Sequence, residues 1–116
     1  NVVLLHGVHS SANITHHNKF RHLADVLADN GFTSWLVETS RLVRNRHDYG
    51  ADIAAWVKDA CSGKTFPQEQ EDAFTAIREV FRRVKQQRVW LWGFSLGGII
   101  ALSAAAVLPA RPAAPT

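Results

Sequence analysis

The stretch Trp92-Gly93-Phe94-Ser95-Leu96-Gly97-Gly98 constrains the fold of this 116-residue chain more than any other feature. It follows a short apolar run at 88–92, which predicts a buried strand, and it precedes an alanine-rich apolar run, which predicts a packed helix. A serine between a strand and a helix lies on a sharp turn, where Cβ atoms on its neighbours would clash. Gly93 and Gly97 remove those clashes. The stretch therefore predicts an α/β fold with Ser95 exposed at the carboxyl end of the sheet.

Two interpretations of Ser95 stay open on this pattern. Ser95 is either an inert serine in a glycine-rich turn or a nucleophile whose Oγ is presented to a substrate. The predicted strand before Ser95 and the predicted helix after it favour the nucleophile. The glycine–serine–glycine spacing by itself sometimes occurs by chance, whereas the same spacing between a strand and a helix is rarer.

A second polar loop follows the apolar run Val2-Val3-Leu4-Leu5, which predicts a parallel strand covered on both faces. The loop reads His6-Gly7-Val8-His9-Ser10-Ser11. Acyl transfer needs two N–H donors aimed at the oxygen that becomes negative in the tetrahedral intermediate. The N–H of Leu96, directly after Ser95, is one candidate donor, and the N–H of Val8, next to the flexible Gly7, is the other.

The histidines of this loop have different expected roles. His6 is expected to orient the loop through hydrogen bonds rather than to transfer protons. His9 is either a polar loop residue or a substitute base for Ser95.

A hydrophobic strand ending in His-Gly, an amphipathic helix, a second strand and then Gly-Phe-Ser-Leu-Gly-Gly resemble the α/β-hydrolase superfamily, in its serine-nucleophile branch of esterases, lipases and serine aminopeptidases. The resemblance implies a partial α/β-hydrolase fold: a three-stranded, mostly parallel sheet between helices, in three α/β/α layers. It places strand 2–5 between strands 33–38 and 88–92. It implies a hydrolase of carboxylic esters or related small acyl substrates, with no cofactor. Ser95 would be its nucleophile, and the oxyanion hole would use the backbone of Val8 and Leu96.

The chain also departs from this family. The family's triad runs in the order serine, acid, histidine, yet no Asp, Glu or His stands between Leu96 and Thr116. We therefore expect a fragment, with residues 1–108 forming a partial hydrolase domain, residues 109–116 forming an Ala/Pro-rich tail, and little activity from the isolated chain. The alternative is a non-catalytic or partner-completed interaction module. In either case strand 88–92 is expected to leave an open edge through which the chain could self-associate.

Three helices are expected from apolar stripes and capping residues. Asn30-Gly31 ends the first, Asp52 caps the second, and Pro67 opens the third. The stripes are Phe20, Leu23, Ala24 and Leu27; Ile53, Trp56, Val57 and Ala60; and Phe74, Ile77, Phe81 and Val84.

Charge and composition narrow the function classes less sharply. The net charge of +3 includes a basic cluster within 41–47, which is expected to be a solvated loop because no nucleic-acid motif accompanies it. The six histidines lack metal-ligand spacing, and the lone Cys61 predicts a small buried side chain. No long apolar run or leader is evident, which predicts a cytoplasmic protein without a membrane span.

Trp90 and Trp92 should share one side of the sheet and pack in the core, with Trp92 a candidate wall of the acyl pocket.

Overall fold

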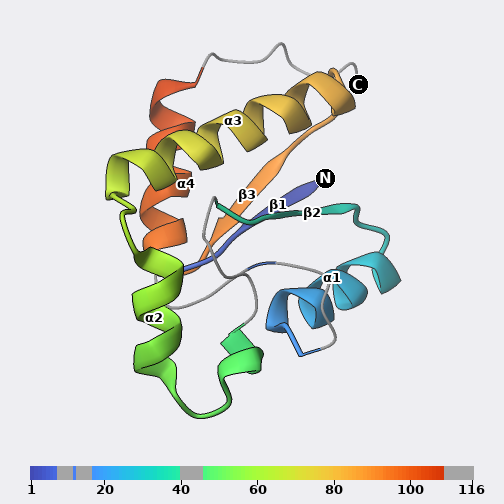
Figure 1. Cartoon of the computed structure of the whole chain (residues 1–116). Helices are drawn as coiled ribbons and strands as arrows, with labels where there is room; N and C mark the ends of the chain where they lie inside the picture. Colours follow the sequence, from blue (N-terminus) through green and yellow to red (C-terminus); the bar gives the residue numbers. More distant parts are fainter. Residues whose placement is uncertain (8–11, 13–16, 40–45, 109–116) are drawn as a thin grey trace.

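The computed structural model describes residues 1–7, 12, 17–39 and 46–108 of the chain (Figure 1). Within them, β1 (Val2–Leu5) pairs in parallel with β2 (Ser34–Val37) on one side and with β3 (Trp90–Gly93) on the other. The strand order β2-β1-β3 confirms that the first strand lies between the other two. All four residues of β1 are buried, as expected for a parallel strand covered on both faces.

Helices cover both faces of this sheet and form the expected three α/β/α layers (Figure 1). Side chains of β1 alternate between the faces. Val2 and Leu4 pack with Phe20 of α1 (Lys19–Asp29), whereas Val3 and Leu5 pack on the opposite face. That opposite face is covered by α3 (Phe66–Val84) and α4 (Leu96–Val107). The α/β class predicted from the sequence is confirmed.

The helices α1, α2 and α3 begin where the side chain of a capping residue accepts a hydrogen bond from a free N–H group. The side chain of Asn18 accepts a hydrogen bond from the N–H of Phe20 and so caps α1. Asp52 caps α2 (Ile53–Cys61) as expected, and Thr65 caps α3 one residue before Phe66, with Pro67 in the first turn. The first helix ends at the expected Asn30-Gly31, where Gly31 has φ +84°.

Several sequence predictions differ from the structure in detail. Strand β2 is one residue shorter at each end than the predicted 33–38, and β3 begins two residues later and ends one residue later than the predicted 88–92. A short 3₁₀ helix, η1 (Arg46–Tyr49), precedes α2. Cys61 is half-buried rather than buried, and Ile53 of the second stripe is 44% exposed. Residues 40–45 and the tail 109–116 lie outside the described part of the chain.

The expectation that Trp90 and Trp92 pack in the core is wrong. They share one face of the sheet as expected, because they pair with Val2 and Leu4, but they are 56% and 42% exposed. The described helix on that face, α1, packs mainly against β2 at the other side of the sheet, and on the β3 side its Phe20 and Lys19 contact Phe94, just after the strand. No helix in the described ranges is long and apolar enough to cross a membrane.

Candidate active site at the Ser95 turn

The strand order gives a point of topological reversal at the carboxyl ends of β1 and β3. The chain leaves β1 toward β2 on one side and later returns to form β3 on the other side of β1. Such a reversal separates the two loops that leave the neighbouring strands, and open α/β sheets bind ligands at this point. The His6-Gly7 segment follows β1 and the Ser95 turn follows β3, so both lie at this point of reversal.

Ser95 adopts a backbone conformation that L-residues rarely tolerate, with φ 54° and ψ −117°. The N–H of Gly97 donates to the carbonyl oxygen of Phe94 at 2.9 Å and closes a tight turn around Ser95. These angles match the second residue of a type II′ turn, about +60° and −120°, which favours glycine. Ser95 stands at the start of α4 but its side chain does not cap the helix, and the residue is exposed. The Ser95 side chain therefore makes no hydrogen bond to a described residue.

The turn is held against β1 by glycines. A Cβ atom on Gly97 would overlap the carbonyl oxygen of Leu5 and would lie 2.8 Å from that of His6. A Cβ atom on Gly93 would overlap the backbone of Gly97. Only glycine at both positions allows the strand, the turn and the neighbouring strand to approach this closely.

The loop after β1 lies beside Ser95. A Cβ atom built on Gly7 would lie 3.2 Å from the Cβ of Ser95 and 3.8 Å from its Oγ. The structure thus brings together the two segments, about ninety residues apart, that the sequence predicted to form one site. Val8 and His9, the next residues of this loop, lie outside the described residues.

His6 is buried and both of its ring nitrogens are occupied. The backbone N–H of Thr39, which can only donate, lies 3.4 Å from Nε2, and the Thr39 hydroxyl lies 3.3 Å from the same atom. Nε2 is therefore the acceptor and Nδ1 carries the proton, which it donates to the carbonyl oxygen of Gly7 at 2.8 Å. His6 ties the loop after β1 to the end of β2, which agrees with an orienting role and leaves no ring nitrogen to serve Ser95.

Thr39 is the residue of this site that the sequence interpretation missed. It is buried and directly follows the segment predicted as the second strand. Because the carboxyl ends of parallel strands meet at one edge, a polar residue at that position is a usable signal.

The N–H of Leu96 is one of the groups that the start of α4 leaves without an intrahelical acceptor. The N–H groups of Gly97 and Gly98 donate to the carbonyl oxygens of Phe94 and Ser95. No described residue accepts a hydrogen bond from Leu96 N–H, so this donor remains available next to Ser95.

Aromatic side chains lie beside the turn. The ring of Phe94 stacks on Trp92 with centroids 5.5 Å apart and meets Phe20 edge-on at 5.3 Å. The ammonium of Lys19 lies 5.2 Å from the centroid of Phe94. Among the described residues, the neighbourhood of the Ser95 turn therefore combines aromatic side chains with the ammonium of Lys19.

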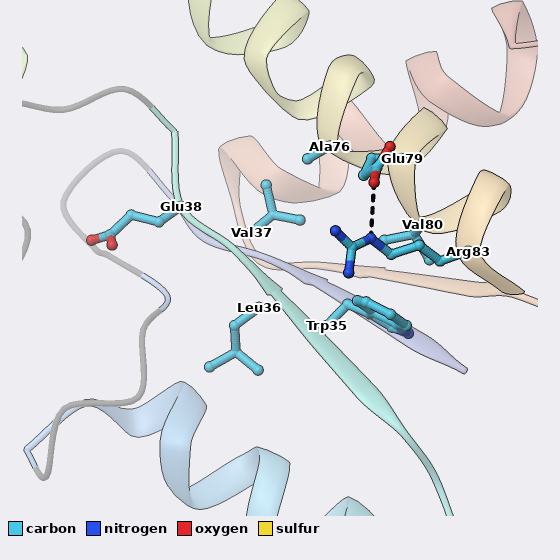
Figure 2. A pocket seen from close by; sticks show the side chains of 8 residues that line it. All are labelled: Trp35, Leu36, Val37, Glu38, Ala76, Glu79, Val80 and Arg83. Atoms are coloured by element: carbon cyan, nitrogen blue, oxygen red, sulfur yellow. Dashed lines mark hydrogen bonds and ion pairs between the residues drawn. The ribbon is translucent and has the colours of Figure 1, made fainter.

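A groove of about 300 Å³ between β2 and α3 is separate from this site (Figure 2). It lies at the β2 edge, whereas Ser95 follows β3 at the opposite edge. Hydrogen bonds from Arg82 and Arg83 lower the pKa of Glu79, at the rim of the groove, to about 2. The lining residues are Trp35, Leu36, Val37, Glu38, Ala76, Glu79, Val80 and Arg83.

Among the described residues, no group of three or more His, Cys, Asp or Glu side chains could hold a metal ion. Comparison of the chain with models of known protein families, with curated proteins and with solved structures found no match. The site is therefore defined by its own geometry: an exposed serine on a strained turn, beside an N–H group that donates to no described residue.

The strain at Ser95 can be compared with that at Lys85, the other described non-glycine residue with positive φ. Lys85 has φ 56° and ψ −115° in an exposed turn closed by Gln87 N–H and the Val84 carbonyl oxygen. Glycine adopts these backbone angles without strain, and the turn is exposed, so we expect Lys85→Gly to raise the free energy of unfolding by about 1 kcal/mol. Urea denaturation measures this, with Gln86→Gly as the control that should destabilise. A loss of stability in Lys85→Gly would contradict the assignment of strain to this turn conformation.

Proposed function

We propose that Ser95 is the nucleophile of a serine hydrolase of the α/β-hydrolase type, which acts on carboxylic esters or related small acyl substrates. The observation that carries the proposal is the conformation of Ser95 together with its place at the carboxyl end of the sheet, which Lys85, with similar angles, does not share. A side chain is kept where glycine would be less strained, and its hydroxyl is exposed rather than used to cap α4. Strained residues concentrate at functional sites. The glycine contacts that hold the turn beside Gly7 give independent support.

The chemistry follows from the atoms at the turn. The Oγ of Ser95 attacks the carbonyl carbon, a C–O bond forms, and the carbonyl oxygen becomes negative. The N–H of Leu96, and in this proposal that of Val8, donate to this oxygen. The intermediate collapses, the alcohol leaves with a proton, and water then releases the acid from the acyl-enzyme. This route needs no cofactor.

The proton of the Ser95 hydroxyl must pass to a base. Both nitrogens of His6 are engaged, so the proposal assigns this step to a histidine that is held by a carboxylate and lies outside the described site. Such a base would come from a longer form of the chain or from a partner chain, and His9 is the remaining candidate within this sequence. The single cysteine, Cys61, suits the reducing cytoplasm that we propose as the location.

The alternative function is a non-catalytic or partner-completed interaction module. The exposed Trp90 and Trp92 favour it, because large apolar side chains on an edge strand mark interaction surfaces. Reactivity of Ser95 discriminates between the two functions.

The test is covalent labelling of the 116-residue chain by a fluorophosphonate probe, with and without added imidazole as a replacement base. We expect slow labelling at Ser95, located by peptide mass spectrometry. Imidazole should accelerate it by about tenfold, which is part of the roughly 100- to 10,000-fold effect of a positioned base. Ser95→Ala should abolish the labelling, and Ser62→Ala, at an exposed serine after α2, should leave it unchanged.

Labelling of the parent chain no higher than that of Ser95→Ala, in a chain whose circular dichroism shows the folded state, would overturn the nucleophile assignment. That result would favour the interaction module.

A further inference from the structure

The free edge of β3 is apolar on both faces of the sheet. On the α1 face, Trp90 and Trp92 are 56% and 42% exposed. On the other face, α4 packs against β3 and itself exposes Ile99 and Leu102, which are 57% and 75% accessible. Edge strands of monomeric proteins are normally protected by lysine, proline, a bulge or a covering segment. No such device is present among the described residues of this edge, which lies at the outside of the sheet beside α4 (Figure 1).

Backbone groups on the same edge are available for pairing. The N–H groups of Trp90 and Phe94 donate to the carbonyl oxygens of Asn1 and Leu5, so the even-numbered residues of β3 turn their backbone groups toward β1. Because successive residues of a strand alternate, the odd-numbered residues turn theirs outward. These outward groups belong to Leu91 and Gly93 of β3 and to Val89 directly before it, and no described strand lies on that outer side of β3.

We propose that a second copy of this chain occupies the edge, with the two β3 strands antiparallel across a two-fold axis at Leu91. The two sheets then form one continuous sheet of six strands. A second copy is the occupant that matches the surface, because a strand added here must be apolar on both faces and β3 has this character itself. The proposal does not depend on the chemistry of Ser95.

The outward backbone groups select the register. With Leu91 on the axis, Leu91 forms a hydrogen-bonded pair with Leu91 of the second copy, and Val89 pairs with Gly93 in both directions. An axis at Trp90 would place Leu91 opposite Val89 of the second copy and leave Gly93 without a partner among the three. An axis at Trp92 would place Leu91 opposite Gly93 and leave Val89 without one. Leu91 at the centre is the arrangement that satisfies all three.

The side chains complement one another in the same register. On the α1 face, Trp90 lies opposite Trp92 of the second copy, as a closely spaced non-hydrogen-bonded pair of the kind that favours aromatic contacts. Arg88 lies opposite Phe94 of the second copy. The guanidinium of Arg88 already lies 5.9 Å from the ring centroid of Trp90, so it would join an aromatic surface that attracts cations.

Charge also favours pairing of identical copies. Residues 89–107 contain no Asp, Glu, Lys or Arg, so no like charges meet across the two-fold axis. The nearest cation, Arg88, faces an aromatic ring rather than its own symmetry mate. The edge is thus electrostatically compatible with itself.

The test is sedimentation equilibrium of the 116-residue chain and of variants at exposed positions of β3. We expect a species of about twice 12.9 kDa for the parent chain. Trp90→Glu and Trp92→Lys should each weaken dimerisation by at least about tenfold, because each variant removes the Trp90–Trp92 aromatic contact on both sides of the axis. In Trp90→Glu a carboxylate also lies against the electron-rich face of a tryptophan ring. The double variant should restore the dimer, since the introduced carboxylate faces the introduced ammonium twice. Val26→Lys, at a 56% exposed position of α1, is the matched control that stays dimeric.

Three results would overturn the proposal. They are a folded parent chain that is monomeric at about 100 µM, a parent chain that forms polydisperse aggregates, and a folded double variant that stays monomeric. The last result rejects the register specifically, because an axis at Trp90 would bring the two introduced carboxylates together. A folded monomer would indicate that a different chain, rather than a second copy, occupies this edge.

Discussion

Gly97→Ala is expected to destabilise the chain by about 3 kcal/mol, whereas Gly98→Ala, one residue further, should stabilise it by about 0.5 kcal/mol. The alanine methyl at position 97 would overlap the carbonyl oxygen of Leu5, and backbone of a buried central strand cannot move aside as a side chain can. At Gly98 the nearest atom to the new methyl is 3.4 Å away, so the helix propensity of alanine decides the sign. Urea denaturation followed by tryptophan fluorescence measures both effects.

The same pair of variants tests the placement of the candidate site. A folded population of Gly97→Ala must shift the Ser95 turn away from the loop after β1, so its labelling by the fluorophosphonate should fall toward that of Ser95→Ala. Gly98→Ala should retain the labelling of the parent chain. Equal stability of the two glycine variants would contradict the close approach of α4 to β1, and with it the position of Ser95 beside Gly7.

Phe20→Ala is expected to destabilise the chain by about 3–5 kcal/mol. The ring of Phe20 is fully buried between α1 and the sheet, where it packs with Leu4 and meets Phe94 edge-on at 5.3 Å. Its removal takes the main anchor from α1, and a single small domain has only about 5–15 kcal/mol of stability to lose. The loss should appear as a lower urea midpoint with an unchanged slope.

Phe32→Ala is the matched control for this prediction. It removes the same side chain from a position that is 45% exposed, so we expect a loss of about 1 kcal/mol or less. Similar losses in the two variants would contradict the assignment of Phe20 as the anchor of α1.

Local features of the fold could be predicted from the sequence because they depend on neighbouring residues. The cap at Asp52, the helix end at Asn30-Gly31 and the apolar β1 are decided within a few residues, and the structure has all three. The turn at Ser95 was also predictable, since the glycines on either side of it are required by the close approach of strand and helix.

Burial at the sheet edge could not be predicted in the same way. An apolar strand indicates that something should cover it, but its sequence does not say which helix extends over it. Trp90 and Trp92 were therefore expected in the core and are exposed, because α1 packs against β2 instead. The hydrogen bonds of His6 to Thr39 depend likewise on two loops that are thirty-three positions apart.

The sequence by itself determined the α/β class, the helix and strand order and the turn that carries Ser95, because periodicity, capping and steric exclusion act over short stretches of chain. Only the tertiary structure decided which groups meet at the carboxyl edge. The order β2-β1-β3 places Gly7 against Ser95 and engages both nitrogens of His6. The physical reason is that such contacts depend on how the strands are arranged across the sheet, which local sequence patterns do not encode.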